Sequence, residues 1–265
     1  ANTVSVDNVE VFETEVTSDI DSGVWVETLK PGIKYKFDPA TMPHVMVRET
    51  DGSFSYRQAV WDERLVGDDT VLKNPTFVGE TINRILLFKT RIAFLSEDNT
   101  ILSRASDLFN FFRETALALL DTDPIDIPAV HDKVSILKQG VAFDRELLLF
   151  SDQTQFLLSS DGSLTPASVS MTPITEFENN TNISPILVGN NVYFPSERGN
   201  FSSMLEYFVQ ENGEADSVDV ASNVPKYIPK DLDLMIGSDN ENMIAIKSSE
   251  EPNALYIYYF VWNGE

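Results

Sequence analysis

Short hairpin patterns that recur along the chain constrain the fold more than any other feature of the sequence. Four segments carry runs rich in Ile, Leu, Val, Phe and Tyr that are bounded by Asp, Asn, Ser and Gly, as is typical of strands and turns. They are Arg84–Ser103, Glu146–Ser159, Ser184–Tyr207 and Leu234–Trp262. The centres of successive segments are 56, 44 and 52 residues apart, which fits propeller blades of about 40–50 residues. We predict an all-β, propeller-like fold with about four blades in an incomplete ring; the alternative is one large sandwich.

The segment from Arg91 to Phe112 is the clearest copy. Arg91–Leu95 supplies the first strand, Glu97-Asp98-Asn99 supplies a turn, and Thr100–Ser103 returns. This pattern predicts a hairpin, followed by a run of aromatic residues that packs against it.

Residues 1–75 have a different character and predict a small β module that leads into the repeats. Strands are expected at Val24–Leu29 and Tyr35–Phe37, and a hairpin is expected where His44–Glu49 and Ser53–Val60 flank Thr50-Asp51-Gly52. The boundary is predicted near Lys73-Asn74-Pro75, so that residues 76–265 form the partial propeller.

One segment has helical rather than strand periodicity. In Ser106–Leu120 the apolar residues recur at helical spacing, and Ser106 or Asp107 is suited to cap the first turn. The residue before a proline avoids the helical region, so Asp121-Thr122-Asp123-Pro124 ends the predicted helix.

The last strand pattern, Ala254–Trp262, is nearly continuously apolar, and Asn263-Gly264 after it is a hairpin turn signal. A long apolar edge strand without a partner favours aggregation. We therefore expect the natural protein to continue beyond this chain, with the propeller truncated at its C-terminal end.

The balance of charge excludes several classes of function. There are 19 Lys and Arg against 42 Asp and Glu, a net charge of −23. Residues 1–75 carry −7, residues 76–150 carry −3 and residues 151–265 carry −13. A surface of this sign repels phosphate and argues against nucleic-acid binding. No apolar run approaches the roughly 20 residues of a membrane span, so no membrane anchor is expected.

Few side chains have the spacing that catalysis or metal binding requires. His44 and His131 are the only histidines, and neither lies in a zinc-binding spacing. Asp121, Asp123 and Asp126 invite comparison with a calcium loop, but Pro124 and Ile127 occupy the wrong places. The alternative interpretation is that these carboxylates bind turns and backbone amides.

Two further patterns suggest ligands only weakly. Ser96-Glu97-Asp98 and Ser159-Ser160-Asp161 approach the acidic-loop signature of sialidase blades without its Gly, Thr and Trp. Five aromatic residues of the last strand could form a stacking platform, although packing explains most of them better; they are Tyr256, Tyr258, Tyr259, Phe260 and Trp262. We predict no enzyme activity and no catalytic, cofactor-binding or metal-binding residue.

Motifs in register along most of the chain resemble one known family. They include TMPH at 41–44, NPTFVG at 74–79, SRASDLFNFF at 103–112, DTDPID at 121–126, LLLFSDQTQFLL at 147–158, ERG at 197–199 and VPKYIP at 224–229. With these motifs the chain resembles tail tubular protein B, the nozzle protein of short-tailed podoviruses. Family members are much longer than this chain.

The resemblance implies a structural component of a phage tail. Such a protein would form the channel for genome ejection and would contact the tail adaptor (tail tubular protein A) and the tail fibres. It would self-associate into a ring at full length, let DNA pass without binding it specifically, and reside in the virion tail after assembly in the host cytoplasm. The alternative function is a carbohydrate-binding or glycoside-hydrolysing β-propeller that recognises the host surface.

Overall fold

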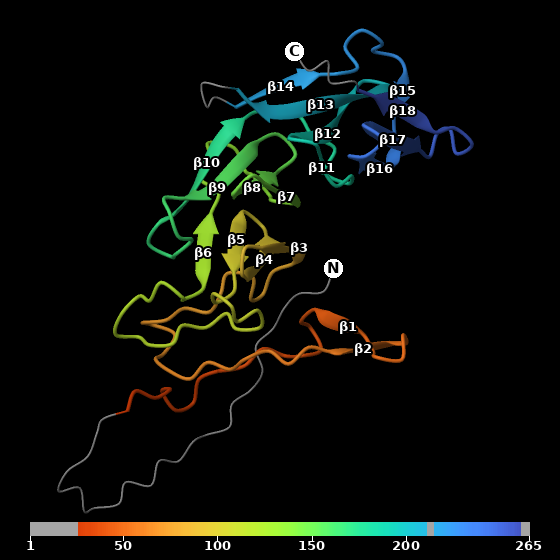
Figure 1. Ribbon diagram of the computed structural model, residues 1–265. Helices are drawn as coiled ribbons and strands as arrows, with labels where there is room; N and C mark the ends of the chain where they lie inside the picture. The colour runs from red at the N-terminus through yellow and green to blue at the C-terminus, as the bar shows by residue number, and fades with distance from the viewer. Residues whose placement is uncertain (1–25, 211–214, 261–265) are drawn as a thin grey trace, which may run out of the picture. The chain divides into compact units, whose positions relative to one another are not determined.

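The computed structural model describes residues 26–210 and 215–260, and all regular structure in these ranges is β (Figure 1). The chain divides into two compact units. The first comprises residues 1–128 and 160–169, and the second comprises residues 129–159 and 170–265. Four small sheets have the antiparallel, blade-like character of a propeller, and the predicted all-β, four-bladed fold class is confirmed.

The first unit contains a two-stranded and a four-stranded sheet. The smaller sheet pairs β1 with β2, and the larger has the order β3-β4-β5-β6, so that neighbours in the sequence are neighbours in the sheet. The strands are β1 (His44–Arg48), β2 (Phe54–Gln58), β3 (Ile82–Phe88), β4 (Arg91–Ser96), β5 (Asn99–Leu102) and β6 (Ile125–Pro128). Both predicted hairpins of this region are confirmed, with Gly52 at φ 86° in the turn of the first.

The second unit contains three sheets, each with antiparallel neighbours. Their orders are β10-β9-β8-β7, then β11-β12-β13-β14 with β15 added against β13, then β16-β17-β18. The strands of the first are β7 (Gln139–Phe143), β8 (Glu146–Phe150), β9 (Gln155–Ser160) and β10 (Val169–Thr175). The remaining strands are β11 (Ile186–Val188), β12 (Asn191–Arg198), β13 (Phe201–Val209), β14 (Ala215–Asp219), β15 (Ile228–Pro229), β16 (Leu232–Ser238), β17 (Met243–Ser248) and β18 (Tyr256–Tyr259).

Each unit is built around clusters of buried apolar side chains. The core of the first unit is aromatic and includes Phe37, Phe77, Phe94 and Phe111, and the rings of Phe94 and Phe111 stack with their centroids 4.7 Å apart. Because Phe37 comes from the predicted N-terminal module and Phe94 from the first blade, residues on both sides of position 75 share one core. The boundary at position 75 stays a prediction.

The clusters of the second unit join its neighbouring sheets. Phe150 of β8 packs against Phe194 of β12, with ring centroids 5.1 Å apart, and Val188 of β11 belongs to a cluster with Met235 of β16. At Gly237 of β16, an added Cβ would lie 2.2 Å from Val188 Cγ2. A side chain at position 237 would therefore require the side chain of Val188 to shift.

The helix predicted for Ser106–Leu120 is wrong, because side chains take the backbone amides that a helix would use. Asn110 Oδ1 accepts from Phe112 N at 2.9 Å, Glu27 Oε1 accepts from Ala116 N at 2.6 Å, and Asp123 Oδ2 accepts from Leu120 N at 2.8 Å. With these amides already bonded to side chains, the segment forms a long loop. The apolar periodicity came from core packing of Phe111 and Phe112, not from a helical face.

Two predicted strands of the N-terminal region are also wrong where they can be compared. Residues 26–29 and 35–37 contain only isolated bridges, including a parallel bridge between Leu29 and Gly67. Their backbone groups bind irregular segments, as in the bonds from Lys30 N to Gly67 O and from Arg64 N to Tyr35 O. The last predicted strand is shorter than expected, because β18 covers only Tyr256–Tyr259; Trp262, Asn263 and Gly264 lie outside the described residues.

Candidate interaction surfaces

The two histidines lie far apart in sequence and have local structural contacts. The ring of His44 stacks on Tyr56, with centroids 5.3 Å apart, and His131 Nε2 lies 3.4 Å from Glu176 Oε1. In the part of the chain that the structure describes, no three His, Asp or Glu side chains are grouped so that they could hold a metal ion.

The three aspartates that invited comparison with a calcium loop point to different partners. Asp123 is fully buried, and its carboxylate accepts hydrogen bonds from the amides of Glu114 and Leu120. Asp126 accepts from both the amide and the hydroxyl of Thr76, each at 2.8 Å. Although the residue is exposed at the surface, desolvation by neighbouring atoms raises the pKa of Asp126, while these two bonds oppose the increase. The interpretation that these carboxylates bind backbone amides is confirmed for Asp123 and Asp126.

The two segments that approach the sialidase signature lie at strand ends. Ser96-Glu97-Asp98 closes the β4–β5 hairpin, with Glu97 at a left-handed φ of 48°. Ser159-Ser160-Asp161 ends β9 and begins the following turn. Both segments therefore have the positions of turn residues.

The aromatic residues of β18 serve mainly as core. Tyr256, Tyr258 and Phe260 are partly buried against the cluster shared by the last two sheets, and Tyr193 stacks on Phe260 at 6.2 Å. Tyr259, on the opposite face, is 66% exposed. The prediction that most of these rings pack, rather than form a platform, is confirmed for the described ones.

Sequence reasoning missed a buried polar network around Arg91. Its guanidinium is nearly inaccessible and donates to five backbone carbonyls in three regions: Ser103 O at 2.6 Å, the carbonyls of residues 121–123 at 2.7–3.5 Å, and Leu164 O at 3.3 Å. Burial lowers the pKa of Arg91, and the neighbouring carboxylate of Asp123 opposes this effect. One side chain thus fixes the two ends of the loop that follows β5.

Asp123 completes the positioning of this loop. Besides the two amides, its carboxylate accepts from Arg113 Nε at 3.3 Å, and Arg113 Nη2 donates to Ala118 O at 2.6 Å. Because Arg113 directly follows Phe111 and Phe112 in the chain, the network sets both the aromatic core and one wall of a neighbouring pocket.

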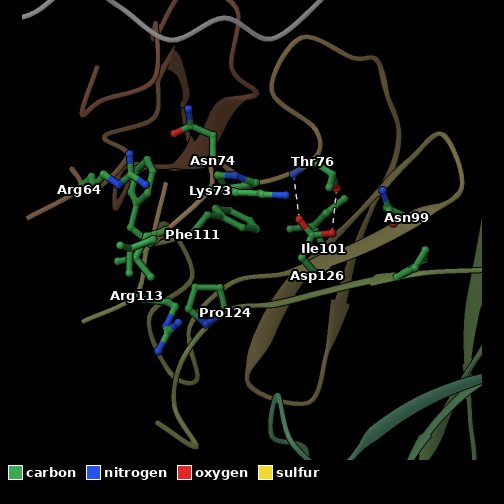
Figure 2. A pocket seen from close by; sticks show the side chains of 15 residues that line it. Arg64, Lys73, Asn74, Thr76, Asn99, Ile101, Phe111, Arg113, Pro124 and Asp126 are labelled. Atoms are coloured by element: carbon green, nitrogen blue, oxygen red, sulfur yellow. Dashed lines mark hydrogen bonds between the residues drawn. The ribbon is translucent and has the colours of Figure 1, made fainter. Parts of the chain in front are cut away.

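This pocket, which we term the cationic pocket, has a volume of about 550 Å³ and lies within the first unit (Figure 2). Its floor is apolar and consists of Leu72, Ile101, Phe111 and Phe112, all buried. Its charged lining residues are Arg64, Lys73, Arg113 and Asp126. In Figure 2, Arg64 and Arg113 lie on one side, and Asp126, bonded to Thr76, lies on the other.

A second surface of the first unit is exposed and apolar. In the β1–β2 hairpin, Met46 pairs with Tyr56 and Arg48 pairs with Phe54, so these four side chains share one face. Met46, Phe54 and Tyr56, which we term the hairpin face, are each at least 66% exposed. An isolated two-stranded hairpin is marginally stable in water. A covering surface would therefore stabilise it.

Comparison with known proteins places the chain in a family. The family model of the bacteriophage nozzle protein matches residues 12–265. The chain is 36% identical over 252 residues to tail tubular protein gp12 of Escherichia phage T7, an alignment that covers 94% of this chain and 32% of the relative. The chain belongs to the bacteriophage nozzle protein family, as its motifs predicted. It spans about a third of the length of this relative.

Two solved structures that the chain resembles are distant from it. A quinonprotein alcohol dehydrogenase-like protein of Bacteroides thetaiotaomicron has a TM-score of 0.45 at 11% identity, over 97% of this chain and 51% of that one. Hsv2 of Kluyveromyces lactis has a TM-score of 0.42 at 12% identity, over 85% and 58% of the two chains. Neither likeness bears on activity. Among the described residues there is also no helix long and apolar enough to cross a bilayer.

Proposed function

We propose that this chain is a structural part of a phage tail nozzle, in the virion tail, and that the longer protein forms the channel through which the genome leaves. The match of the nozzle family to residues 12–265 is the observation that supports this proposal. The role is structural rather than catalytic. The alternative, a carbohydrate-binding or carbohydrate-cleaving propeller, is not favoured by the family match.

The charge of the chain fits a channel that DNA must traverse without being held. Its net charge is −23, and the excess of acids is greatest in residues 151–265. Fixed negative charge near a polyanion raises the energy of close approach, so phosphates are repelled rather than bound. A wall of this sign lowers friction during ejection.

Contacts with other tail proteins belong to the same proposal. We assign the hairpin face to contact between subunits of the tail, because Met46, Phe54 and Tyr56 lie together and are exposed. Exposed apolar groups of this kind mark protein interaction sites. The tail adaptor, the tail fibres and neighbouring copies in a ring are the proposed partners of the longer protein.

Immuno-electron microscopy of virions tests the assignment. Antibodies raised against this chain should label the tail of intact particles and should not label capsids from a mutant that lacks the gene. Those mutant particles should retain DNA in their heads when mixed with host cells. Label on the capsid, or mutant particles that eject DNA normally, would contradict the proposal.

A further inference from the structure

The last sheet of the second unit has one strand fewer than the other blade-like sheets. Three sheets run through four strands in chain order, β3-β4-β5-β6, β7-β8-β9-β10 and β11-β12-β13-β14, so each strand lies beside the strand that precedes it in the sequence. The last sheet follows the same order but, within the described residues, ends at β18. A fourth strand placed by the same rule would follow β18 in the sequence and lie along its free edge.

The free edge of β18 presents backbone groups that can bond such a strand. β18 pairs antiparallel with β17, and just beyond the strand Phe260 N donates to Asn242 O at 3.0 Å. Because backbone bonds alternate along an antiparallel pair, the backbone groups two and four positions before Phe260 also face β17. Ile257 and Tyr259 therefore turn their N–H and C=O groups away from β17. An edge of this kind is a template for another strand.

An apolar groove of about 290 Å³, which we term the β18 groove, runs along the same edge. All four residues of β18, Tyr256–Tyr259, line it. Since successive residues of a strand point to opposite faces, a groove lined by all four borders the edge of β18 rather than one face. Its other lining residues come mainly from the neighbouring sheet and its connections, and none is charged; they are Met204, Val220, Ala221, Val224, Tyr227, Ile228 and Ile246.

Large side chains of the groove are exposed to water. Val224 is 52% exposed, Tyr227 is 55% exposed and Tyr259 is 66% exposed, and no residue of β18 is fully buried. By contrast, Tyr207 of β13, the third strand of the neighbouring sheet, has a strand on either side and is only 1% exposed. Exposed apolar surface of this kind marks a contact site. A strand beside β18 would remove this surface from water while bonding the free edge.

Two observations favour the continuation of this chain as the source of that strand. The alignment with the phage T7 relative covers 32% of the relative, so most of a protein of that length lies outside this segment. In addition, Asn263-Gly264 is a hairpin turn signal shortly after β18. A hairpin returns the chain antiparallel along the edge of the strand that it leaves.

We infer that the free edge of β18 and the β18 groove bind a fourth, antiparallel strand, supplied by the residues that follow this chain in the longer protein. The backbone of that strand bonds the N–H and C=O groups of Ile257 and Tyr259. Its apolar side chains on one face enter the groove beside Val224 and Tyr227, and the side chains between them point to the other face. The inference rests on family membership and on the geometry of the last sheet, and not on the proposed role in the tail.

Amide hydrogen exchange measured by NMR tests the inference. The chain is compared with a form extended by about 15 residues of its natural continuation, enough for a loop and one strand. We expect the amides of Ile257 and Tyr259 to exchange at least about tenfold more slowly in the extended form, because the added strand accepts their hydrogen bonds. The amide of Tyr258 faces β17 in both forms, so its rate should change less. An extension of equal length made of Gly and Ser should leave all three rates unchanged.

Two variants test whether the groove takes part in binding. In the extended form, Val224→Asp should reduce the added protection of Ile257 and Tyr259 by about threefold or more, because the added strand would bury the new carboxylate without a partner. Val134→Asp makes the same change at an exposed valine of the same unit that does not line the groove. It should leave the added protection intact.

Three results would overturn the inference. Equal exchange with the natural and the Gly/Ser extensions would mean that no strand is added. Protection of Ile257 and Tyr259 without any extension would assign the edge to another partner, a second copy if the protection rises with protein concentration and another part of the same chain if it does not. Equal effects of Val224→Asp and Val134→Asp would exclude the groove. Because the measurement uses no assembled tail, each of these results leaves the virion-labelling test of the proposed function unaffected.

Discussion

Replacing Arg91 by Met removes the donors that fix the long loop after β5 while nearly preserving side-chain volume. Its two shortest bonds, 2.6 Å to Ser103 O and 2.7 Å to Asp123 O, are buried. Each buried acceptor left unsatisfied costs about 1–3 kcal/mol. The carbonyls of Asp121 and Leu164 are only partly buried, so water can replace the lost donor there. We therefore expect Arg91→Met to lower the free energy of unfolding of the first unit by about 3–5 kcal/mol.

Urea unfolding followed by the fluorescence of Trp61 measures this change. Trp61 packs against Phe94, Phe109 and Phe111, so its emission reports on the affected core. Trp25 and Trp262 are replaced by Phe in every protein compared, which leaves Trp61 as the only tryptophan.

The matched variants separate the network from charge alone. Arg48→Met, at an exposed position of β1, should change stability by less than about 0.5 kcal/mol. Arg91→Lys keeps the charge but offers one nitrogen in place of a fork, so its loss should be intermediate. A loss below about 1 kcal/mol for Arg91→Met would refute the reasoning, because the carbonyls would then have found other donors.

Three further outcomes are expected. Gly237→Ala should destabilise the second unit, because its Cβ would meet Val188 Cγ2 at 2.2 Å; adding Val188→Ala should restore part of the loss in thermal melts, and additive effects would contradict this explanation. Burial raises the pKa of Tyr207 to about 12, so the unfolded chain, with an ordinary tyrosine pKa of about 10, loses the proton first. Stability is then retained below pH ~10 and falls up to pH ~12 by about 1.4 kcal/mol per pH unit; urea titrations of Tyr207→Phe should show a shallower fall, and an unchanged slope would exclude this group. At physiological salt the chain should not shift duplex DNA in a gel; micromolar binding that weakens steeply with added salt would contradict a repelling channel.

The strands were predictable where local pattern and tertiary packing agree. The β4–β5 hairpin has two short apolar strands, both largely buried, and a polar turn between them, so the local sequence pattern and the tertiary packing favour the same structure. The loop at 106–120 shows the opposite case. Its apolar spacing resembles a helix, yet its amides bind Glu27 and Asp123, which lie up to 89 residues away. Single-sequence periodicity contains no information about such partners.

The cationic pocket could not have been predicted from the sequence for a related reason. Arg64, Lys73 and Arg113 are separated by as many as 49 residues and share no motif. Tertiary folding brings them together, and Asp123 pairs with Arg113 while Asp69 pairs with Arg64. The acidic background conceals the cluster further, since a composition dominated by 42 acids gives no indication of a local excess of bases.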